Sequence, residues 1–326
     1  MAGPSLIALA AAAVLVGAGA PSAGTAGPPA VVRVTTLGTN GGAILNKGRA
    51  QPANLLEVDG KAYLIDAGAG TLRQLAQVGV SPMRIDQIFI THNHIDHNAD
   101  WPLLMAHAYV VGRRTPMTVL GPGGTVHMRD AFLSFLEPIA ETAGRAPPPA
   151  DALKEVFRAQ DIGEGLVFAD DRVRVTAIEN CHYHPAPGAA AQPRQRSYAL
   201  RFEARGKVVV FSGDTGPCEA RLAPFARGAD LLIHEVIDVP AVLAVLRTQA
   251  GVEYSQAQWA EIEAHMREDH TTPEEVGRLA AAAGVKTVVL SHIVPGSGGD
   301  PKAYAAEVRK HFSGPVIVAE DLQVFD

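Results

Sequence analysis

Short apolar runs alternate with stretches of helical periodicity along most of the chain. Residues 31–36 alternate between apolar and polar positions, as a half-buried strand does. Residues 54–58 and 62–65 are similar, and they flank Asp59-Gly60, a dipeptide typical of a tight hairpin turn. The opening section is therefore expected to be an antiparallel part of a sheet.

The later apolar runs are short enough to be core strands. They comprise residues 88–90, 173–178, 197–202, 208–211, 231–233, 288–290 and 315–318. Helical spacing occupies residues 70–78, 99–109 and 126–140, whereas residues 145–150 contain three consecutive prolines and are expected to form a loop. This alternation predicts an α/β fold. No linker-like change in composition divides residues 31–326, which are expected to form a single domain.

Two more helices are expected within residues 239–270, where they would form a helical insert between two strands. A further helix has unusually clear end signals. Thr272 is a typical N-cap, Pro273 fits the first position of the helix, and Glu275 can bond back to the cap. This helix should run to about residue 283 and end at Gly284.

The first 26 residues have the features of a signal peptide. Residues 6–20 are uncharged and apolar, and they are shorter than the roughly 20 residues that a membrane-spanning helix needs. Small residues up to Ala26 offer cleavage sites, although residues 1–5 lack the Lys or Arg that usually opens such a segment. We expect a periplasmic or secreted protein with no membrane span after cleavage. The alternative is an alanine-rich buried helix.

The overall charge and the cysteine count restrict the partners. Asp and Glu number 34 and Lys and Arg number 28, a net charge of -6, so the chain as a whole does not attract nucleic acid, which is not expected as a partner. The two cysteines, Cys181 and Cys218, are too few for a disulfide scaffold. A disulfide between them and a pair of free thiols both remain open.

Several of the apolar runs are followed directly by a residue that can bind a metal or transfer a proton. The residues in these positions are His92, Asp214, His234, Glu235 and His292. Ligands collect at the carboxyl ends of strands in α/β sheets, because the chain turns there and side chains converge on one crevice. The sequence therefore predicts a functional site that several strand ends share.

The densest group of such residues is the pattern H-x-H-x-D-H at residues 92–97. Side chains two positions apart in an extended segment point the same way, so His92 and His94 can bind one cation. Asp96 and His97 can then offer an oxygen and a nitrogen to a second cation nearby. This loop predicts a metal centre.

The chain resembles the metallo-β-lactamase fold superfamily, and most closely the branch that contains ribonuclease Z, arylsulfatases and phosphodiesterases. Beyond the histidine motif, the resemblance is carried by residues 37–39 (LGT), 63–68 (YLIDAG), 71–75 (TLRQL) and 85–92 (IDQIFITH), in this order and spacing. It implies a four-layer αββα sandwich with the metal centre at one rim.

The resemblance also implies roles for individual residues. His92, His94 and His182 would bind a first zinc ion; Asp96, His97 and His292 would bind a second; Asp214 would bridge them. His184 is the alternative to His182. Of the two, His182 is favoured because it lies at the usual distance after the preceding strand. Mn²⁺ or Fe²⁺ also fits such a mixed donor set.

Other roles that the resemblance implies concern the reaction itself. His270, supported by Glu235, would lie near the bond that is cleaved, and Asp96 would be essential for catalysis through the second metal. Asp66 would orient the histidine loop rather than bind metal. The Gly-Pro-Gly-Gly segment at residues 121–124 does not match a nucleotide-binding loop and is expected to form a turn.

These features together predict an exported dinuclear zinc hydrolase that cleaves a small ester, a phosphodiester or aryl sulfate, with a metal-bridged hydroxide. Residues 185–196 are too short for a tRNA-binding arm, although Arg194 and Arg196 could bind a small anionic group. The alternatives are a lactonase or β-lactamase-type hydrolase, and a non-catalytic zinc-dependent binding protein. The oligomeric state stays open, a homodimer included.

Overall fold

The computed structural model describes residues 32–42, 44, 46–142, 150–184, 192–248, 253–295 and 300–326. The segment expected to be a signal peptide, residues 1–26, lies outside these ranges. So do residues 145–149 of the expected proline-rich loop, whereas Ala150 is the first residue of a helix.

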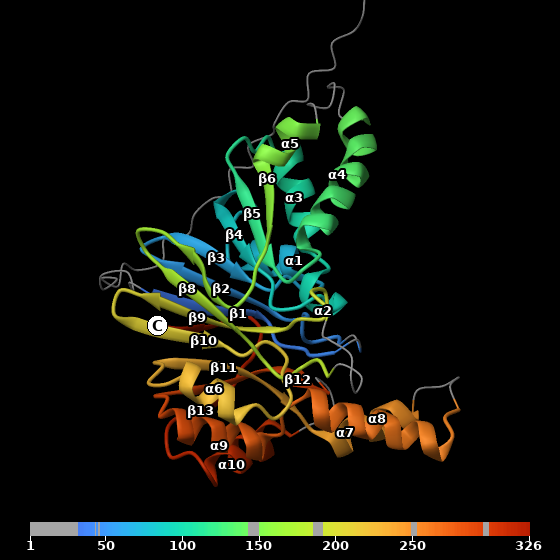
Figure 1. Cartoon of the computed structure of the whole chain (residues 1–326), viewed down its shortest axis with the longest axis vertical. Helices are drawn as coiled ribbons and strands as arrows, with labels where there is room; N and C mark the ends of the chain where they lie inside the picture. The colour runs from blue at the N-terminus through green and yellow to red at the C-terminus, as the bar shows by residue number, and fades with distance from the viewer. Residues whose placement is uncertain are drawn as a thin grey trace, which may run out of the picture.

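The described strands form two seven-stranded sheets (Figure 1). In spatial order, the first sheet consists of β14 (Gln323–Phe325), β1 (Val32–Gly38), β2 (Ala53–Val58), β3 (Lys61–Ile65), β4 (Ile85–Phe89), β5 (Met117–Gly121) and β6 (Phe157–Asp161). The second consists of β13 (Val316–Val318), β12 (Val288–Val294), β11 (Leu231–Ile237), β10 (Lys207–Phe211), β9 (Tyr198–Ala204), β8 (Arg174–Glu179) and β7 (Gly165–Ala169). Each sheet is mixed: β14 to β3 and β7 to β10 pair antiparallel, whereas β3 to β6 and β10 to β13 pair parallel.

Most of the helices lie on the outer faces of the two sheets (Figure 1). Those that follow strands of the first sheet are α1 (Thr71–Gln77), α2 (Ile95–Asn98), α3 (Trp101–Val110), α4 (Thr125–Thr142) and α5 (Ala150–Val156), with a 3₁₀ turn, η1 (Pro82–Arg84). Those of the second half are α6 (Glu219–Phe225), α7 (Val239–Thr248), α8 (Gln256–Asp269), α9 (Pro273–Ala283) and α10 (Pro301–Arg309). None of the helices in the described ranges is both long and apolar enough to cross a membrane.

Three apolar cores hold these layers together. The sheets pack face to face through residues such as Phe89, Val175 and Phe202, which form the central core. Trp101 belongs to a second core between the first sheet and its helices, and Leu279 belongs to a third core beside the second sheet. Helix, sheet, sheet and helix therefore follow one another, which confirms the predicted αββα sandwich.

Most of the predicted elements occur where the sequence places them. The hairpin turns at Asp59-Gly60, and α9 begins after Thr272, whose backbone N–H donates to the Glu275 carboxylate over 2.8 Å. Gly284 ends α9 with φ +61°, a conformation that favours glycine. The strands β6, β7 and β14 escaped prediction because they lie at or near sheet edges, where exposed positions weaken the apolar pattern.

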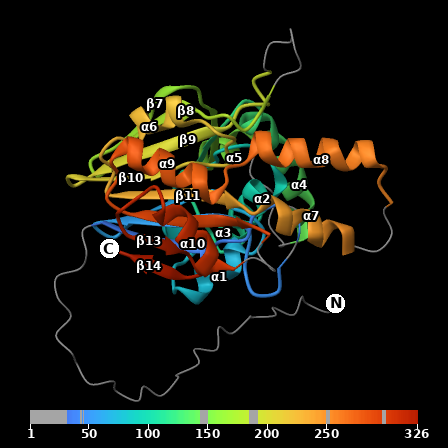
Figure 2. The same ribbon diagram turned by 90° about the horizontal axis from the view of Figure 1, so that it is seen from below.

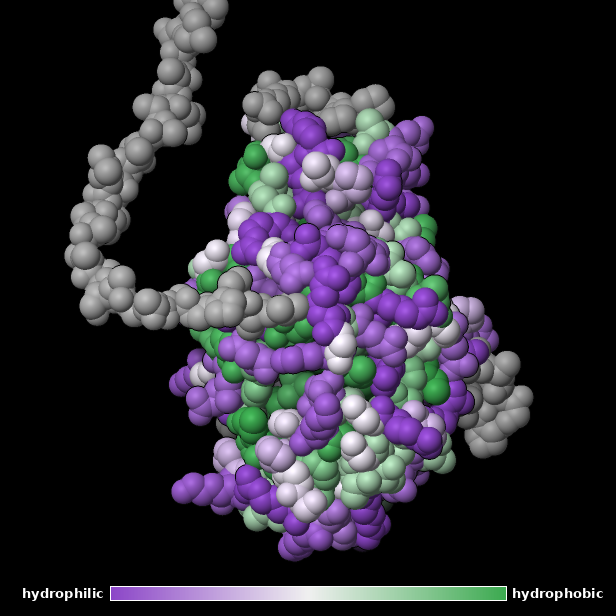
Figure 3. Space-filling view, turned by 90° about the vertical axis from the view of Figure 1, so that its left-hand side faces the viewer, coloured by the Kyte–Doolittle hydropathy of each residue, from purple (hydrophilic) through white to green (hydrophobic). Residues whose placement is uncertain are grey.

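The helices α7 and α8 occupy the segment expected to be a helical insert. They pack on each other through Val242, Leu243, Trp259 and Ile262, while no residue of α8 is fully buried. Both ribbon views show this pair extending from the body on the side where α2 lies (Figures 1 and 2). The face of the molecule shown in Figure 3 instead carries hydrophilic residues interspersed with apolar ones.

Candidate metal centre

All the residues expected to bind metal come together where ends of strands from the two sheets meet. His92 and His94 follow β4, and α2 contributes Asp96 and His97. His182 follows β8, Asp214 follows β10, and His292 lies within β12. The parallel strands of both sheets end at this rim, so residues far apart in the sequence become neighbours.

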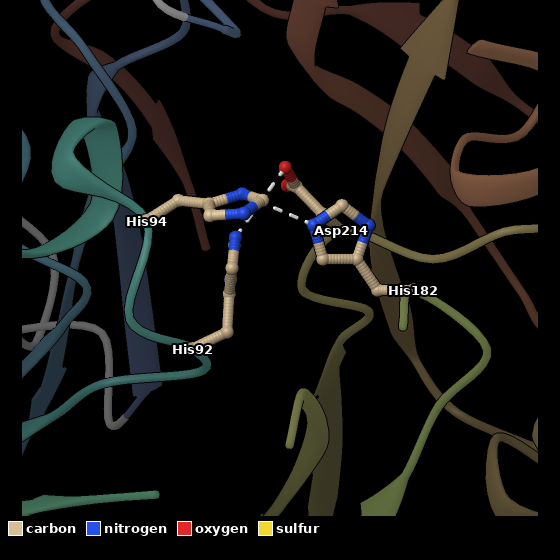
Figure 4. Close-up of side chains that lie close together, drawn as sticks. All are labelled: His92, His94, His182 and Asp214. Carbon is tan, nitrogen blue, oxygen red and sulfur yellow. Dashed lines mark hydrogen bonds and ion pairs between the residues drawn. The ribbon is translucent and has the colours of Figure 1, made fainter. Parts of the chain in front are cut away.

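The donor atoms form two groups that share one carboxylate. His92, His94, His182 and Asp214 each offer a ligand atom, and these atoms lie within 4.8 Å of one another (Figure 4). His92 Nε2 is 3.6 Å from Asp214 Oδ2, and His182 Nε2 is 3.1 Å from His94 Nδ1. His94 is exposed while the other three are buried, so the group opens to solvent at His94.

The second group lies on the other side of the same carboxylate. Asp96, His97, Asp214 and His292 are all buried, and their donor atoms are also within 4.8 Å of one another. His97 Nε2 is 3.1 Å from Asp214 Oδ1, and His292 Nε2 is 3.0 Å from Asp214 Oδ2. Asp214 is thus positioned to be shared between two cations.

Several of these donor atoms are buried without a partner in hydrogen-bond geometry among the described residues, even where a nitrogen and an oxygen lie 3.0 to 3.1 Å apart. They are Nε2 of His92, His97 and His292, together with Oδ1 of Asp214. Burying an unpaired polar atom costs about 1–3 kcal/mol, and more if it is charged. Cations bound between these atoms would satisfy them, and imidazole and carboxylate donors suit divalent metals of the zinc type. The residues therefore fit a pair of divalent cations.

The electrostatics of the centre favour positive charge. Burial lowers the pKa of His92 and brings that of His182 to about 4, so both imidazoles stay neutral, as metal ligands must. Burial also opposes a charge on His292, but the carboxylates of Asp214 and Asp96 outweigh it and raise its pKa to about 10. The two carboxylates thus attract protons or, equally, metal cations.

Asp66 supports the histidine loop through hydrogen bonds, as the sequence predicts. Its carboxylate accepts from the backbone N–H of Thr91 at 2.8 Å and lies 2.9 Å from Nδ1 of His97. The second contact leaves Nε2 of His97 to face the donor group. Asp66 has φ +56° and His292 has φ +44°, left-handed conformations that cost a non-glycine residue energy and are typical of functional sites.

The structure distinguishes between the two candidates for the third histidine. His182 donates from Nδ1 to the backbone carbonyl of Asp269 over 2.8 Å, which directs its Nε2 towards His94. His184 lies outside both donor groups, with a half-exposed side chain whose Nδ1 is 2.7 Å from the Asp269 carboxylate. His182 is therefore the residue placed to bind metal, and Asp269, which no sequence pattern indicates, orients it.

The predicted pair of His270 and Glu235 lies next to the second donor group. His270 Nδ1 is 2.9 Å from Oε2 of Glu235, and these two residues and His292 have donor atoms within 4.8 Å of one another. Burial lowers the pKa of His270, but the Glu235 charge raises it more, and the net shift is upward. The pair is thus able to hold a proton beside the centre.

The end of α8 reaches this region through a close backbone contact. A Cβ atom added to Gly216 would lie only 1.7 Å from the carbonyl oxygen of Glu268, so a larger residue would push α8 away. The ring of Tyr183, a second feature absent from the sequence prediction, packs against His182 and His94 with centroid distances of 4.8 and 5.4 Å. The centre is enclosed by elements from both halves of the chain.

A disulfide bond joins Cys181 to Cys218, which settles the question that the sequence left open. Their Cα atoms are 5.6 Å apart. Cys181 precedes His182, and Cys218, four residues after Asp214, is the N-cap of α6. The bond therefore fastens together two loops that carry donor residues.

Comparison with known proteins agrees with this geometry. Residues 61–293 match the model of the β-lactamase superfamily domain. The chain belongs to this superfamily. It is 30% identical over 303 residues to ribonuclease Z of Mycobacterium avium, a match that covers 90% of this chain and 97% of the relative. It is also 31% identical over 332 residues to ribonuclease Z of Methanosarcina acetivorans, with the same coverage of 90% and 97%.

Solved structures show the same fold. The metallo-β-lactamase fold protein YhfI of Bacillus subtilis aligns with a TM-score of 0.67 and 21% identity, over 90% of this chain and 99% of that one. Human short-form tRNase Z aligns with a TM-score of 0.59 and 23% identity, over 90% and 98% of the two chains. This superfamily member is therefore a metal-dependent hydrolase of the branch that includes ribonuclease Z and phosphodiesterases.

Replacing the shared carboxylate should weaken binding at both cation positions. We expect Asp214→Asn to lower the affinity for Zn²⁺ at least about 100-fold, because loss of even a residue that merely supports a ligand typically costs 10–100-fold. Isothermal titration with Zn²⁺ measures this. Asp230→Asn is the matched control, since Asp230 pairs with Lys286 outside the donor groups. Equal zinc affinity in both variants would contradict the shared role of Asp214.

Removing the disulfide should destabilise the fold. For a separation of 37 residues, the chain-entropy model gives a loss of about 3–4 kcal/mol in the free energy of unfolding for the double variant Cys181→Ser/Cys218→Ser. Urea denaturation under oxidising conditions tests this value. A reducing agent should destabilise the unsubstituted protein to a similar degree and leave the variant unaffected; a reductant effect on neither protein would argue against the bond.

Proposed function

We propose that the chain is an exported hydrolase that uses two Zn²⁺ ions to cleave a small phosphodiester. The proposal rests on two donor groups that share Asp214. The pair of His270 and Glu235, which can hold a proton, lies at the edge of these groups. When bound, two such cations lower the pKa of water towards about 7 and neutralise the charge that develops on phosphoryl oxygens.

The side chains around the centre have separate tasks in this proposal. His92 and His182 stay neutral, and their Nε2 atoms face the first donor group as donors for metal. The backbone N–H of Gly42 donates to Oδ2 of Asp96 over 2.9 Å and so holds this carboxylate in the second group. His270, whose pKa the Glu235 carboxylate raises, donates its proton to the departing oxygen of the ester.

A small substrate suits this chain better than a structured RNA. The relatives in Mycobacterium and Methanosarcina are ribonucleases by name, and a phosphodiester is the bond that a ribonuclease hydrolyses. The net charge of -6 nevertheless provides no general attraction for a polyanion, and only residues 180–197 connect β8 to β9 beside the centre. An aryl sulfate has a similar tetrahedral anionic group and is the second ester that this site would accept.

The proposed export rests on two independent features. Residues 6–20 have the composition of a signal-peptide core, and disulfides such as the bond between Cys181 and Cys218 persist in oxidising compartments. A periplasmic or secreted location supplies both the cleavage of the leader and the oxidation of the thiols.

A substrate panel tests the proposed reaction. We expect the zinc-loaded protein to hydrolyse bis(p-nitrophenyl) phosphate with a higher kcat/KM than p-nitrophenyl sulfate, a lactone or a β-lactam, because the centre is matched to a phosphoryl group. A chelator should abolish the activity, and added Zn²⁺ should restore it. Preference for the lactone or the β-lactam would contradict the proposal and favour the carbonyl hydrolases of the superfamily.

The proposed proton donor can be separated from the metal ligands. We expect His270→Ala to lower kcat by about 10²–10⁴-fold, the usual contribution of a positioned general acid. The affinity for Zn²⁺ should change far less than in Asp214→Asn. Among the described residues, His270 belongs only to the group with Glu235 and His292, and to neither group that contains Asp214. Glu235→Gln should show a smaller loss in kcat than His270→Ala. Full kcat in His270→Ala would remove this residue from the mechanism.

A further inference from the structure

Two arginines follow the candidate third histidine, and the structure gives them different surroundings. The guanidinium of Arg196 forms an ion pair with the carboxylate of Glu179 in β8. Arg194 is exposed, and in the ranges that the structure describes no carboxylate forms an ion pair with it. The residues outside those ranges include no Asp or Glu. Of these two arginines, Arg194 is therefore the one without an anionic partner among the described residues.

The backbone of Arg194 is attached to the histidine loop. The side-chain amide of Asn93, which lies between His92 and His94, donates to the carbonyl of Gly123 over 3.2 Å and to that of Arg194 over 3.4 Å. One amide therefore bridges two segments beside the metal-binding motif. The backbone of Arg194 is therefore held beside the histidine loop, while its side chain is exposed.

The Gly-Pro-Gly-Gly segment forms the surface on which this loop lies. A Cβ atom added to Gly123 would come within 2.7 Å of Pro193, and one added to Gly124 would lie 3.2 Å from Cγ and 3.3 Å from Nε of Arg194. Gly124 also has φ +101°, which disfavours any other residue. Both glycines thus permit close packing, and the aliphatic part of the Arg194 side chain is aligned along the turn.

A positioned arginine without a partner is suited to an anion that comes from outside. The planar guanidinium offers paired N–H donors that match the oxygens of a phosphate or carboxylate. A hydrogen bond from Asn93, between His92 and His94, places the backbone of Arg194 beside the loop that carries metal-donor histidines. An anion bound by Arg194 would lie beside the histidine loop, where a substrate held at the centre could present a second anionic group.

We propose that Arg194 determines specificity by binding a second anionic group of the substrate, so that the site prefers a phosphodiester that carries a further phosphate. This inference rests on the proposed phosphodiesterase function. The second phosphate has two sources, a terminal phosphate on a small molecule or the next phosphate of a short oligonucleotide. Both present the same chemistry to the guanidinium.

A matched pair of substrates tests the proposal. Ethyl p-nitrophenyl phosphate carries only the scissile group. The second compound, 2-(phosphonooxy)ethyl p-nitrophenyl phosphate, adds a terminal phosphate. The unsubstituted enzyme should have a higher kcat/KM for the second compound. In Arg194→Ala the ratio of the two kcat/KM values should fall about tenfold, mainly through KM, as expected for the loss of one charge-assisted hydrogen-bonded contact. Arg194→Lys should retain part of the preference, since it keeps the charge but not the planar fork.

Arg227→Ala is the matched control. Arg227 is another exposed arginine without an ion pair among the described residues, and it follows α6, away from the histidine loop. Its replacement should leave the ratio unchanged. Equal falls in Arg194→Ala and Arg227→Ala, or a ratio near one in the unsubstituted enzyme, would overturn the proposal.

Two further arms identify the source of the second phosphate and separate the two proposals. In the first arm, a dinucleotide with a 5′-phosphate is compared with the same dinucleotide without it. Faster cleavage of the phosphorylated form, with the difference lost in Arg194→Ala, indicates an oligonucleotide substrate. If only the small ester shows this dependence on its second phosphate, the substrate is a small molecule. Hydrolysis of both p-nitrophenyl esters with no dependence on Arg194 refutes this inference and leaves the proposed function standing. No hydrolysis of any phosphodiester refutes both.

Discussion

The carboxylate of Asp214 lies 2% exposed between two sets of imidazoles, and the architecture of the centre depends on keeping its charge compensated. A carboxylate buried without a partner costs several kcal/mol, even after the protein relaxes around it. Nε2 atoms of His97 and His292 approach it to 3.1 and 3.0 Å, and the positive charge on these residues lowers the pKa of Asp214 well below its usual range despite burial. Two divalent cations would meet the same demand with directed bonds, and this accounts for the orphaned donor atoms around it.

The fold brings that charge and its partners together from distant parts of the chain. The first sheet supplies the histidine loop after β4, and the second supplies Asp214 and His292. Loops are usually mobile, so the loops that carry the donor residues must be held in place by further contacts. Asp66 holds the histidine loop, the disulfide joins the His182 loop to the segment after Asp214, and the backbone of Asp269 directs His182. The C-terminal end of α8 therefore reaches the centre itself.

Much of this could be predicted from the sequence, because the strongest signals are local. The spacing of H-x-H-x-D-H, the polar residues after apolar runs and the capping residues around Thr272 each depend on a few adjacent positions. What the sequence could not decide depends on distances across the fold. The choice of His182 over His184 follows from a carbonyl group on α8, and the pairing of Cys181 with Cys218 follows from a Cα separation of 5.6 Å. The different surroundings of Arg194 and Arg196 likewise depend on where Glu179 lies.

Anomalous diffraction at the zinc edge, from crystals of the protein purified with Zn²⁺, tests the central claim most directly. The account predicts two peaks, one within the group of His92, His94 and His182 and one within the group of Asp96, His97 and His292, with Asp214 contacting both. A single peak that Asp214 does not contact, or zinc bound only elsewhere on the molecule, would contradict it.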